Sequence, residues 1–328
     1  MIFVLVALCS LTDFPLKLKD MEILSSDQSI DGNSALTIGV FDGIHVGHQK
    51  VLTRLDGLAR PQKLKRVVVT FNVHPLTVLA TGHAPKMLLS LDRKLELLEQ
   101  SQLVDAVLVI DFDVKRAEQT AQDFVNEVLV KQLKARQVLV GSNFVFGNMR
   151  QGNVSMLKEM GVHNDFEVSP VELLCNESES PVSSTLIRQY ISVGNISKAN
   201  ELLTRPHELS GVVVPGDQVG NELGYPTANT QVDDSMSIPS DGVYSGRATL
   251  ESGQVLKSAI SIGVRPMFHE DNIRVIEPYL LDFNEMIYGQ KLTIQFIEKL
   301  RDQMVLESVD ALIKQIDADV QRVRDSIR

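Results

Sequence analysis

The stretch Leu36–Leu52 reads L-T-I-G-V-F-D-G-I-H-V-G-H-Q-K-V-L and predicts a strand, a turn and a helix in succession. Its first part, Leu36–Val40, is a short apolar run typical of a buried strand. Asp42, Gly43 and Gly47 then indicate a turn, and the residues from Gly47 onward fit the start of a helix. We therefore expect the first half of the chain to be organised around this strand-to-helix junction.

Two histidines lie at the junction. His45 and His48 are three residues apart, so their side chains can face the same way. A helix start offers free N–H groups and a partial positive charge, which attract phosphate. Two imidazoles at this position can donate hydrogen bonds to a phosphate whose charge grows during a reaction. The two histidines are therefore candidate catalytic residues.

Two other interpretations of the histidines stay open. The spacing H-x-x-H supplies two zinc ligands, but no nearby cysteine or third histidine completes a tetrahedral set. The second alternative is a turn that carries two incidental histidines. Against it stand Phe41-Asp42-Gly43, the Gly47 between the histidines, and the strand that precedes them.

The composition is that of an ordinary soluble protein, with 44% hydrophobic and 23% charged residues in 328, enough for two domains. The net charge of −10 argues against a general nucleic-acid binder, because phosphate backbones reward surplus lysine and arginine. The two cysteines, Cys9 and Cys175, argue against a disulfide framework and fit a reducing, cytoplasmic compartment.

The first ten residues, M-I-F-V-L-V-A-L-C-S, are apolar and resemble part of a signal peptide. No lysine or arginine precedes them, and the segment is too short to span a membrane, so we expect no membrane partner. Residues 1–20 form either an edge strand or an extension from an upstream start codon, with Met21 near the working start. The sequence carries no signal for an oligomeric state.

In the first half of the chain, strand and helix patterns alternate. The strands are rich in valine on both faces, which predicts a parallel sheet covered by helices on both sides. We expect strands at Leu36–Val40, Arg66–Phe71, Ala106–Ile110, Gln137–Val140 and Phe166–Pro170. We expect helices at Gly47–Leu58, Leu91–Gln100, Ala121–Leu133 and, in a shorter piece, after Asn153.

Polar residues follow several of these strands, at the sheet edge where ligands bind. His74 and Pro75 follow the second strand, and Asn143 follows the fourth. The segment Ser183–Arg188 reads S-S-T-L-I-R and opens a helix that Ser or Thr can cap. Arg188 lies one turn in, where a guanidinium can bind a triphosphate through two parallel hydrogen bonds. The alternative is a plain helix cap followed by a surface arginine.

We place the domain boundary between residues 204 and 205. The helical run Ile187–Leu203 is interrupted by Gly194-Asn195 and ends before Arg205-Pro206. Beyond it, consecutive strands with short loops favour an antiparallel barrel or sandwich, followed by an amphipathic helix. We expect these strands at Gly211–Pro215, Val243–Leu250, Ser258–Gly263, Arg274–Asp282 and Lys291–Glu298, and the helical face at Val309, Leu312, Ile313, Ile316, Val320 and Val323.

Three stretches of the second half are candidates for chemistry. Gly211, Gly216 and Gly220 form a glycine-spaced segment, although loops between strands also need glycines. In Gly224–Asn229, G-Y-P-T-A-N, a threonine and an asparagine two apart can share one Mg²⁺, and the alternative is an ordinary turn. Glu277 interrupts an apolar strand; it is either a solvated carboxylate or a base that deprotonates an attacking hydroxyl.

The first half resembles the FMN adenylyltransferase module of bacterial bifunctional riboflavin kinase/FAD synthetases. The strings F-D-G-x-H-x-G-H, T-F-x-x-H-P, V-G-x-N-F-x-F-G and S-S-T-x-I-R carry the resemblance and occur in that order within residues 36–205. It implies an α/β nucleotidyl-transferase domain with a Rossmann-like parallel sheet, in which His45 and His48 contact ATP phosphates and Arg188 stabilises the transferring α-phosphate. Nucleotide-binding residues in this half would be Phe41, Asp42, Gly43, Gly47, Asn143, Ser184 and Thr185. Val145 is a departure, because the family often has Arg there.

The second half resembles the riboflavin kinase domain of the same family. Its strings stand here as Gly220–Asn229, Gly242–Tyr244, Ile262–Phe268, Glu277–Phe283 and Ile287–Gly289. The resemblance implies an antiparallel β-barrel with a C-terminal helix, Thr227 and Asn229 at Mg-ATP, Gly216 in the nucleotide site, and Glu277 as catalytic base. Departures from the family pattern are Asn221, Met267 and Ile287.

Together the two resemblances imply an enzyme that phosphorylates riboflavin to FMN with its second domain and adenylylates FMN to FAD with its first. Its substrates would be small molecules, riboflavin, FMN and ATP, with Mg²⁺. The alternatives are a single-activity enzyme with one decayed domain and a flavin-binding protein without catalysis. A tRNA-charging enzyme would use an H-x-G-H motif in the same way, but the chain has no second catalytic motif of such enzymes and no basic tRNA-binding region.

Overall fold

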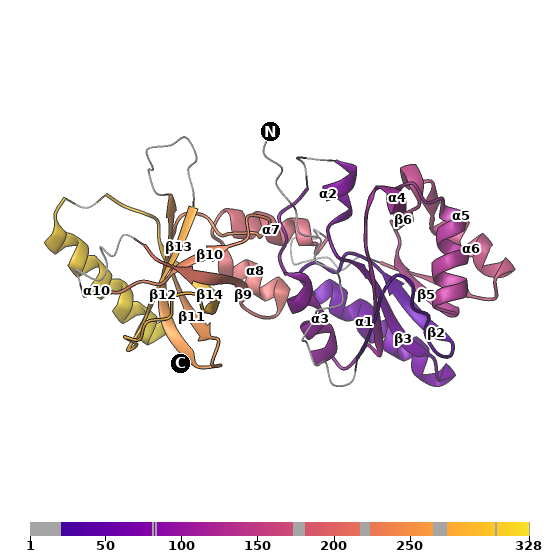
Figure 1. Ribbon diagram of the computed structural model, residues 1–328, viewed down its shortest axis with the longest axis horizontal. Coiled ribbons are helices and arrows are strands. Elements are labelled where there is room, and N and C mark those ends of the chain that lie inside the picture. Colours follow the sequence, from indigo (N-terminus) through magenta and orange to yellow (C-terminus); the bar gives the residue numbers. More distant parts are fainter. Residues whose placement is uncertain are drawn as a thin grey trace. The chain divides into compact units, whose positions relative to one another are not determined.

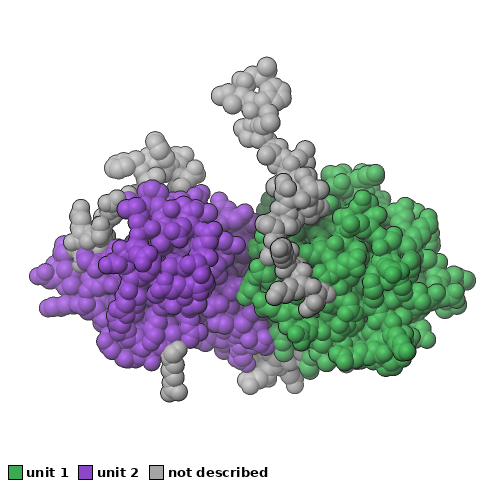
Figure 2. All heavy atoms as spheres, turned by 60° about the horizontal axis from the view of Figure 1, so that its bottom comes forward, with its two compact units in different colours: residues 1–85, 90–174 green, residues 86–89, 175–328 purple. Residues whose placement is uncertain are grey.

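The computed structural model describes residues 21–80, 82, 84–172, 181–216, 224–264, 274–305 and 307–327 (Figure 1). The chain divides into two compact units, residues 1–85 with 90–174 and residues 86–89 with 175–328 (Figure 2). Expectations for residues 1–20, Cys175, Gly220, Asn221 and Met267 lie outside the described residues.

The first unit is built on a six-stranded sheet in the order β1-β4-β3-β2-β5-β8, and every neighbouring pair is parallel. The parallel sheet predicted from the valine-rich strands is therefore confirmed. The short strand β1 was not expected, because its three residues carry too little pattern. The strands are β1 Glu22–Leu24, β2 Ser34–Ile38, β3 Lys65–Phe71, β4 Ala106–Ile110, β5 Ala135–Gly141 and β8 Glu167–Val171.

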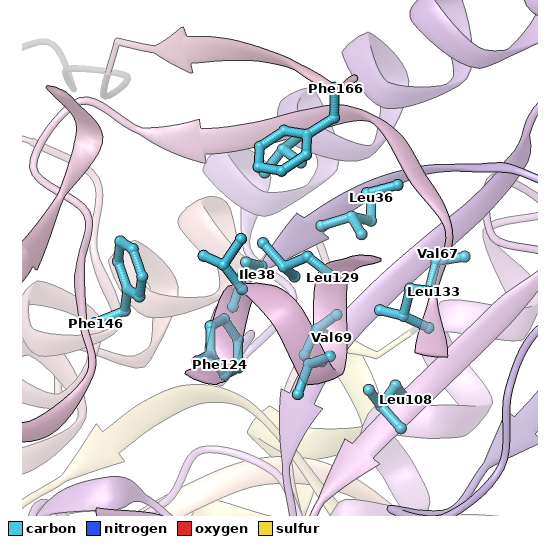
Figure 3. Close-up of a cluster of buried hydrophobic side chains, with 14 of the residues drawn as sticks. Leu36, Ile38, Val67, Val69, Leu108, Phe124, Leu129, Leu133, Phe146 and Phe166 are labelled. Carbon is cyan, nitrogen blue, oxygen red and sulfur yellow. The ribbon is translucent and has the colours of Figure 1, made fainter. Parts of the chain in front are cut away.

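Both faces of this sheet are covered, as the hydrophobic pattern requires. Leu36 and Ile38 of β2 belong to a large cluster with residues of η2 and its neighbours (Figure 3). Ala35, which alternates with them, packs with Leu55 of α1 in a separate cluster. The helical segments of the unit are α1 Val46–Ala59, η1 Arg60–Gln62, α2 Pro75–Leu79, α3 Leu91–Gln100, α4 Val114–Ala117, α5 Ala121–Phe124, η2 Val125–Gln132, η3 Asn148–Arg150 and α6 Val154–His163. A small hairpin joins β6 Val145–Phe146 to β7 Gly152–Asn153.

The helix expected over Ala121–Leu133 is present, but only its first turn is an α-helix. The segment Val125–Gln132 that follows is a π-helix. Its buried residues, Val125, Val128, Leu129 and Gln132, recur at three- and four-residue intervals, as they would in an α-helix, so the hydrophobic pattern does not reveal the helix type.

The second unit contains a closed barrel with the strand order β10-β13-β12-β11-β14-β9. All of its neighbouring pairs are antiparallel, which confirms a barrel and excludes the sandwich. Five of the strands were expected, whereas β10 was not, because N-T-Q-V has a single large apolar residue. The strands are β9 His207–Val214, β10 Asn229–Val232, β11 Gly242–Leu250, β12 Val255–Val264, β13 Arg274–Leu280 and β14 Lys291–Arg301.

Three helices, α7 Ser184–Ser192, α8 Ile196–Leu203 and α10 Val309–Ser326, belong to the second unit. The break expected between the first two is present, with Gly194 at φ 76° and Asn195 capping α8. The Asn200 side chain on α8 donates a hydrogen bond to the backbone oxygen of Phe296 on β14 (2.9 Å). By its contacts, therefore, the described segment 181–204 groups with the barrel, whereas the sequence pattern assigned it to the first domain.

Candidate active sites

The first candidate site lies at the carboxyl end of β2. β2 is flanked in the sheet by β3, which follows it in the chain, and on its other side by β5, which comes later in the chain. In open parallel sheets, ligands bind at such a switch point. The segment from Phe41 to His48 and the residue Asn143 follow the two strands that flank this point, β2 and β5.

The backbone between β2 and α1 is strained. Phe41 (φ 51°) and Ile44 (φ 39°) are in the left-handed region, where bulky residues are rare, and Gly43 between them has φ 90°. Phe41, Asp42 and Ile44 are nonetheless almost fully buried. Such a conformation costs about 1–3 kcal/mol per residue and persists only where the surrounding structure holds it.

The two histidines lie at the end of this loop, where α1 begins. His45 is the N-cap residue of α1, with an extended backbone, and is 5% exposed. The rings of His45 and His48 stack with centroids 3.7 Å apart, and the Phe41 ring lies 4.8 Å from that of His48. The expectation that both imidazoles face the same way is therefore met in the structure. Gly47 lies between them in the first turn.

Asn143 lies two residues beyond the end of β5 and is exposed. Its Oδ1 would be 3.2 Å from a Cβ atom added to Gly141, so the side chain folds back over the strand end. Val145 begins the hairpin strand β6 and is partly exposed. Beyond β3, which pairs with β2 on the side opposite β5, His74 caps α2: its Nδ1 accepts a hydrogen bond from the Leu76 N–H (3.2 Å).

The S-S-T-x-I-R segment opens α7 in the second unit. Ser183 is the cap residue, and its hydroxyl accepts a hydrogen bond from the Leu186 N–H at 3.2 Å. Ser184 and Thr185 occupy the first turn that follows. The Arg188 Nε donates to the backbone oxygen of Lys86 (2.6 Å), which belongs to the same unit. The predicted cap is therefore present, and it is made by Ser183.

The second candidate site is assembled by strand pairing. Thr227 pairs with Tyr279, and Thr230 pairs with Ile276 in the antiparallel ladder. In this register Asn229 lies opposite Glu277, and residues that lie opposite one another share a face. The backbone N–H of Ala228 also bonds to the carbonyl of Pro278 (2.9 Å). Thr227, Asn229 and Glu277 are thus brought together from segments about fifty residues apart.

Gly216 and Tyr225 complete this arrangement. A Cβ atom at Gly216 would lie 1.8 Å from Asn229 Nδ2, so the glycine backbone packs directly on that side chain. Tyr225 stands edge-on to the ring of Tyr279, and its hydroxyl donates to Asp317 Oδ1 on α10 (2.5 Å). This hydrogen bond raises the pKa of Tyr225 to about 12. Tyr225 was not singled out from the sequence, because its partner lies 92 residues away.

The oxygen atoms of this second site suit a magnesium ion. Thr227 and Asn229 each present an uncharged side-chain oxygen, and Glu277 adds a carboxylate on the same strand pair. Mg²⁺ is typically held by few protein oxygens together with waters and phosphates. Within the described residues no cluster of three histidines, cysteines or carboxylates has the geometry of a metal site.

Lys94 on α3 is a further residue of the first site that the sequence did not reveal. It is 1% exposed, and its Nζ donates to Val40 O (3.0 Å), Thr70 Oγ1 (3.1 Å) and Phe71 O (3.2 Å). Burial lowers the pKa of Lys94 to about 8, against the opposing attraction of Asp42. The only sequence signal is its helical spacing beside Leu95 and Leu98, which would ordinarily indicate an apolar residue.

None of the helices in the described part of the chain is both long and apolar enough to cross a membrane. Residues 27–186 match a family model described as FAD synthetase, and residues 203–327 match one described as riboflavin kinase. The two models thus follow the order of the two units.

The chain is similar to bifunctional riboflavin kinase/FMN adenylyltransferases. That of Buchnera aphidicola subsp. Schizaphis graminum is 32% identical over 298 residues, covering 90% of this chain and 95% of the relative. That of Escherichia coli K12 is 35% identical over 291 residues, covering 88% and 91%. A solved structure from Streptococcus pneumoniae, titled a macrolide-efflux protein, has a TM-score of 0.83 at 30% identity and covers 93% of this chain and 99% of its own.

Proposed function

The chain belongs to the bifunctional riboflavin kinase/FMN adenylyltransferase family, and from this premise we propose which residues carry out its two reactions. The barrel unit phosphorylates riboflavin to FMN, and the parallel-sheet unit adenylylates FMN to FAD with release of pyrophosphate. The observation that carries the proposal is that the two family models follow one another along the chain in the order of the two units, and that each spans one set of converging polar residues.

In the kinase step, we assign Glu277 as the base. Its carboxylate takes the proton of the terminal ribityl hydroxyl, and that oxygen attacks the γ-phosphorus of ATP as ADP leaves. Support comes from the pairing of β13 with the segment 227–230, which sets Glu277 opposite Asn229. Gly216 leaves room for the Asn229 side chain beside the nucleotide.

Thr227 and Asn229 would hold Mg²⁺ with the phosphates of ATP. When bound, the ion neutralises phosphate charge and orients the transferring group. The donor set supports this choice, because it offers uncharged oxygens to an ion that keeps several waters.

In the adenylyl step, a phosphate oxygen of FMN attacks the α-phosphorus of ATP and the bond to pyrophosphate breaks. No protein nucleophile is needed, so the first unit orients the reactants and stabilises charge. We assign His45 and His48 as hydrogen-bond donors to the phosphates at the start of α1. Phe41, Asp42, Gly43, Gly47 and Asn143 shape the nucleotide site around them.

Ser184, Thr185 and Arg188 are proposed to bind the ATP phosphates in the same step, with the guanidinium stabilising the α-phosphate. Ser184 and Thr185 fall within the span of the FAD synthetase model. Accordingly we keep residues 21–204 as the adenylyltransferase domain and 205–328 as the kinase domain. A reducing, cytoplasmic location is proposed from the two cysteines.

The test is chromatography of flavins after incubating the full chain with riboflavin, ATP and Mg²⁺. Successive appearance of FMN and FAD is the expected result. Accumulation of FMN alone would indicate a decayed adenylyltransferase site. Retention of riboflavin with no ATP consumed would indicate a flavin-binding protein and overturn the enzymatic assignment.

A further inference from the structure

Lys94 connects the ends of two central strands in the first unit. Its ammonium group has three hydrogens, and each has an acceptor: Val40 O beyond β2, and Thr70 Oγ1 and Phe71 O at the end of β3. The Thr70 hydroxyl in turn donates to Val40 O at 3.0 Å. Burying an ammonium group costs free energy even when all its hydrogens are bonded, and an apolar residue at the same position would cost less. A role for these hydrogen bonds in the adjoining site would explain why a lysine stands here.

The bonded carbonyl of Val40 lies immediately before Phe41, the first residue with a strained backbone. Residues 40–45, which we call the histidine loop, carry the positive φ angles of Phe41, Gly43 and Ile44 and end at His45. Strained backbone needs neighbours that hold it in place. On the β3 side, the described bonds to Val40 O are those of Lys94 and Thr70.

The positive charge of Lys94 also interacts with a carboxylate of the histidine loop. Asp42 is 1% exposed, and its negative charge raises the pKa of Lys94 against the larger lowering by burial. At the same edge of the sheet, Asp111 follows β4, and burial followed by the charge of Asp113 raises the pKa of its carboxyl. Asp42 is the charged group that acts on Lys94 directly.

We propose that Lys94 is a positioning residue for adenylyl transfer: its ammonium group fixes the histidine loop to the end of β3, and through it the imidazoles of His45 and His48. The proposal rests on the adenylyltransferase function proposed above. It adds a residue that touches no substrate and that acts through the backbone carbonyls of Val40 and Phe71.

Loss of the Lys94 proton removes one of its three donors. A neutral amine has two hydrogens and cannot serve three acceptors, so one carbonyl or the Thr70 hydroxyl is released. Because burial lowers the pKa of Lys94 to about 8, adenylyl transfer should fall as the pH rises through that value. The kinase step of the same chain should lack this alkaline fall, since its site lies in the other unit.

The experiment compares Lys94→Met with Lys158→Met, an exposed lysine on α6, in the full chain. Misplacing reacting groups by about 1 Å costs on the order of 100-fold in rate. We therefore expect Lys94→Met to lower kcat for FAD formation from FMN about 100-fold, with little change in KM for ATP and a residual rate that is flat in pH. Riboflavin kinase activity should equal that of the wild type, and Lys158→Met should be normal in both assays.

Thr70→Val provides the milder second variant, in case Lys94→Met also loses kinase activity through misfolding. It removes one acceptor of the ammonium, so the alkaline fall should move to lower pH and the rate should drop several-fold. A folded Lys94→Met protein within about twofold of the wild type would overturn the proposal, as would Thr70→Val with an unchanged pH profile. If the wild type itself makes no FAD from FMN, the proposed function fails instead.

Discussion

The two candidate sites are built in different ways. In the first unit, one strand-to-helix junction with a strained backbone brings together the rings of Phe41, His45 and His48. In the barrel, Thr227 and Asn229 meet Glu277 only because β13 pairs with the segment that leads into β10. The histidine site depends on the contacts that fix one loop, and the Glu277 site depends on the register between two strands.

This difference determines how each site can be damaged. A site made by register tolerates little change in the strand pair, because slippage by one residue moves every side chain to the other face. A site made by a loop is lost when the groups that hold the loop are removed. Because the histidines lie in one unit and the strand pair of Glu277 in the other, single substitutions at these residues should inactivate one reaction and spare the other.

Glu277→Gln should have the largest effect. General-base catalysis contributes typically 10²–10⁴-fold, and glutamine keeps the shape but cannot accept the proton, so FMN formation should fall about 1,000-fold. FAD formation from supplied FMN should be unchanged. Glu251→Gln, at the exposed turn after β11, is the matched control and should be normal in both assays. Equal loss of both activities in a folded protein would contradict the claim that the two reactions use separate sites.

His48→Ala should act in the opposite sense. Removing one donor to a developing phosphate charge costs about 100-fold in kcat, so FAD formation from FMN should fall by about that factor. FMN formation from riboflavin should be spared. His163→Ala changes an exposed histidine at the end of α6 and serves as the control. A normal rate of adenylyl transfer in His48→Ala would remove the imidazole from the proposed chemistry.

Gly216→Ala sharpens the description of the barrel site. The added methyl would lie 1.8 Å from Asn229 Nδ2, so the amide must move away from the cation that we place there. We expect KM for Mg-ATP in the kinase step to rise about tenfold, or about 1.4 kcal/mol of binding. The control is Gly57→Ala, since a Cβ at Gly57 meets no atom within 4 Å. A rise in KM for riboflavin alone would contradict the placement.

The sequence predicted the two architectures and most strands, because alternating hydrophobicity and Val-rich runs report directly on burial. It predicted that His45 and His48 can face the same way, since they lie three residues apart at a helix start, but it did not predict that their rings stack. It did not predict Lys94 or Tyr225. Their partners, Val40 and Asp317, lie 54 and 92 residues away, and short motifs carry no information on such contacts.

The helix type of Val125–Gln132 and the short strands β1 and β10 were also missed. Hydrophobic spacing distinguishes poorly between adjacent helix periods over two turns. Strands of three or four residues form because neighbouring strands offer free hydrogen-bonding groups. Tertiary pairing therefore decides these elements, and local sequence does not.

Tyr225→Phe should have the smallest effect. It removes the hydrogen bond to Asp317 at a partly exposed position, so it should cost less than about 1 kcal/mol and raise KM for Mg-ATP no more than a few-fold. Thermal unfolding and kinase kinetics measure the two quantities. A double-mutant cycle with Asp317→Ala isolates the pair, and additive effects would show that the bond does not position Thr227 and Asn229.

The most direct test of two separately built sites is to mix Glu277→Gln with His48→Ala and follow flavins by chromatography, starting from riboflavin, ATP and Mg²⁺. Neither variant alone should make FAD at an appreciable rate. The mixture should make FMN on His48→Ala and convert it to FAD on Glu277→Gln. Failure of the mixture to form FAD, although each variant retains its single activity, would contradict the independence of the two sites.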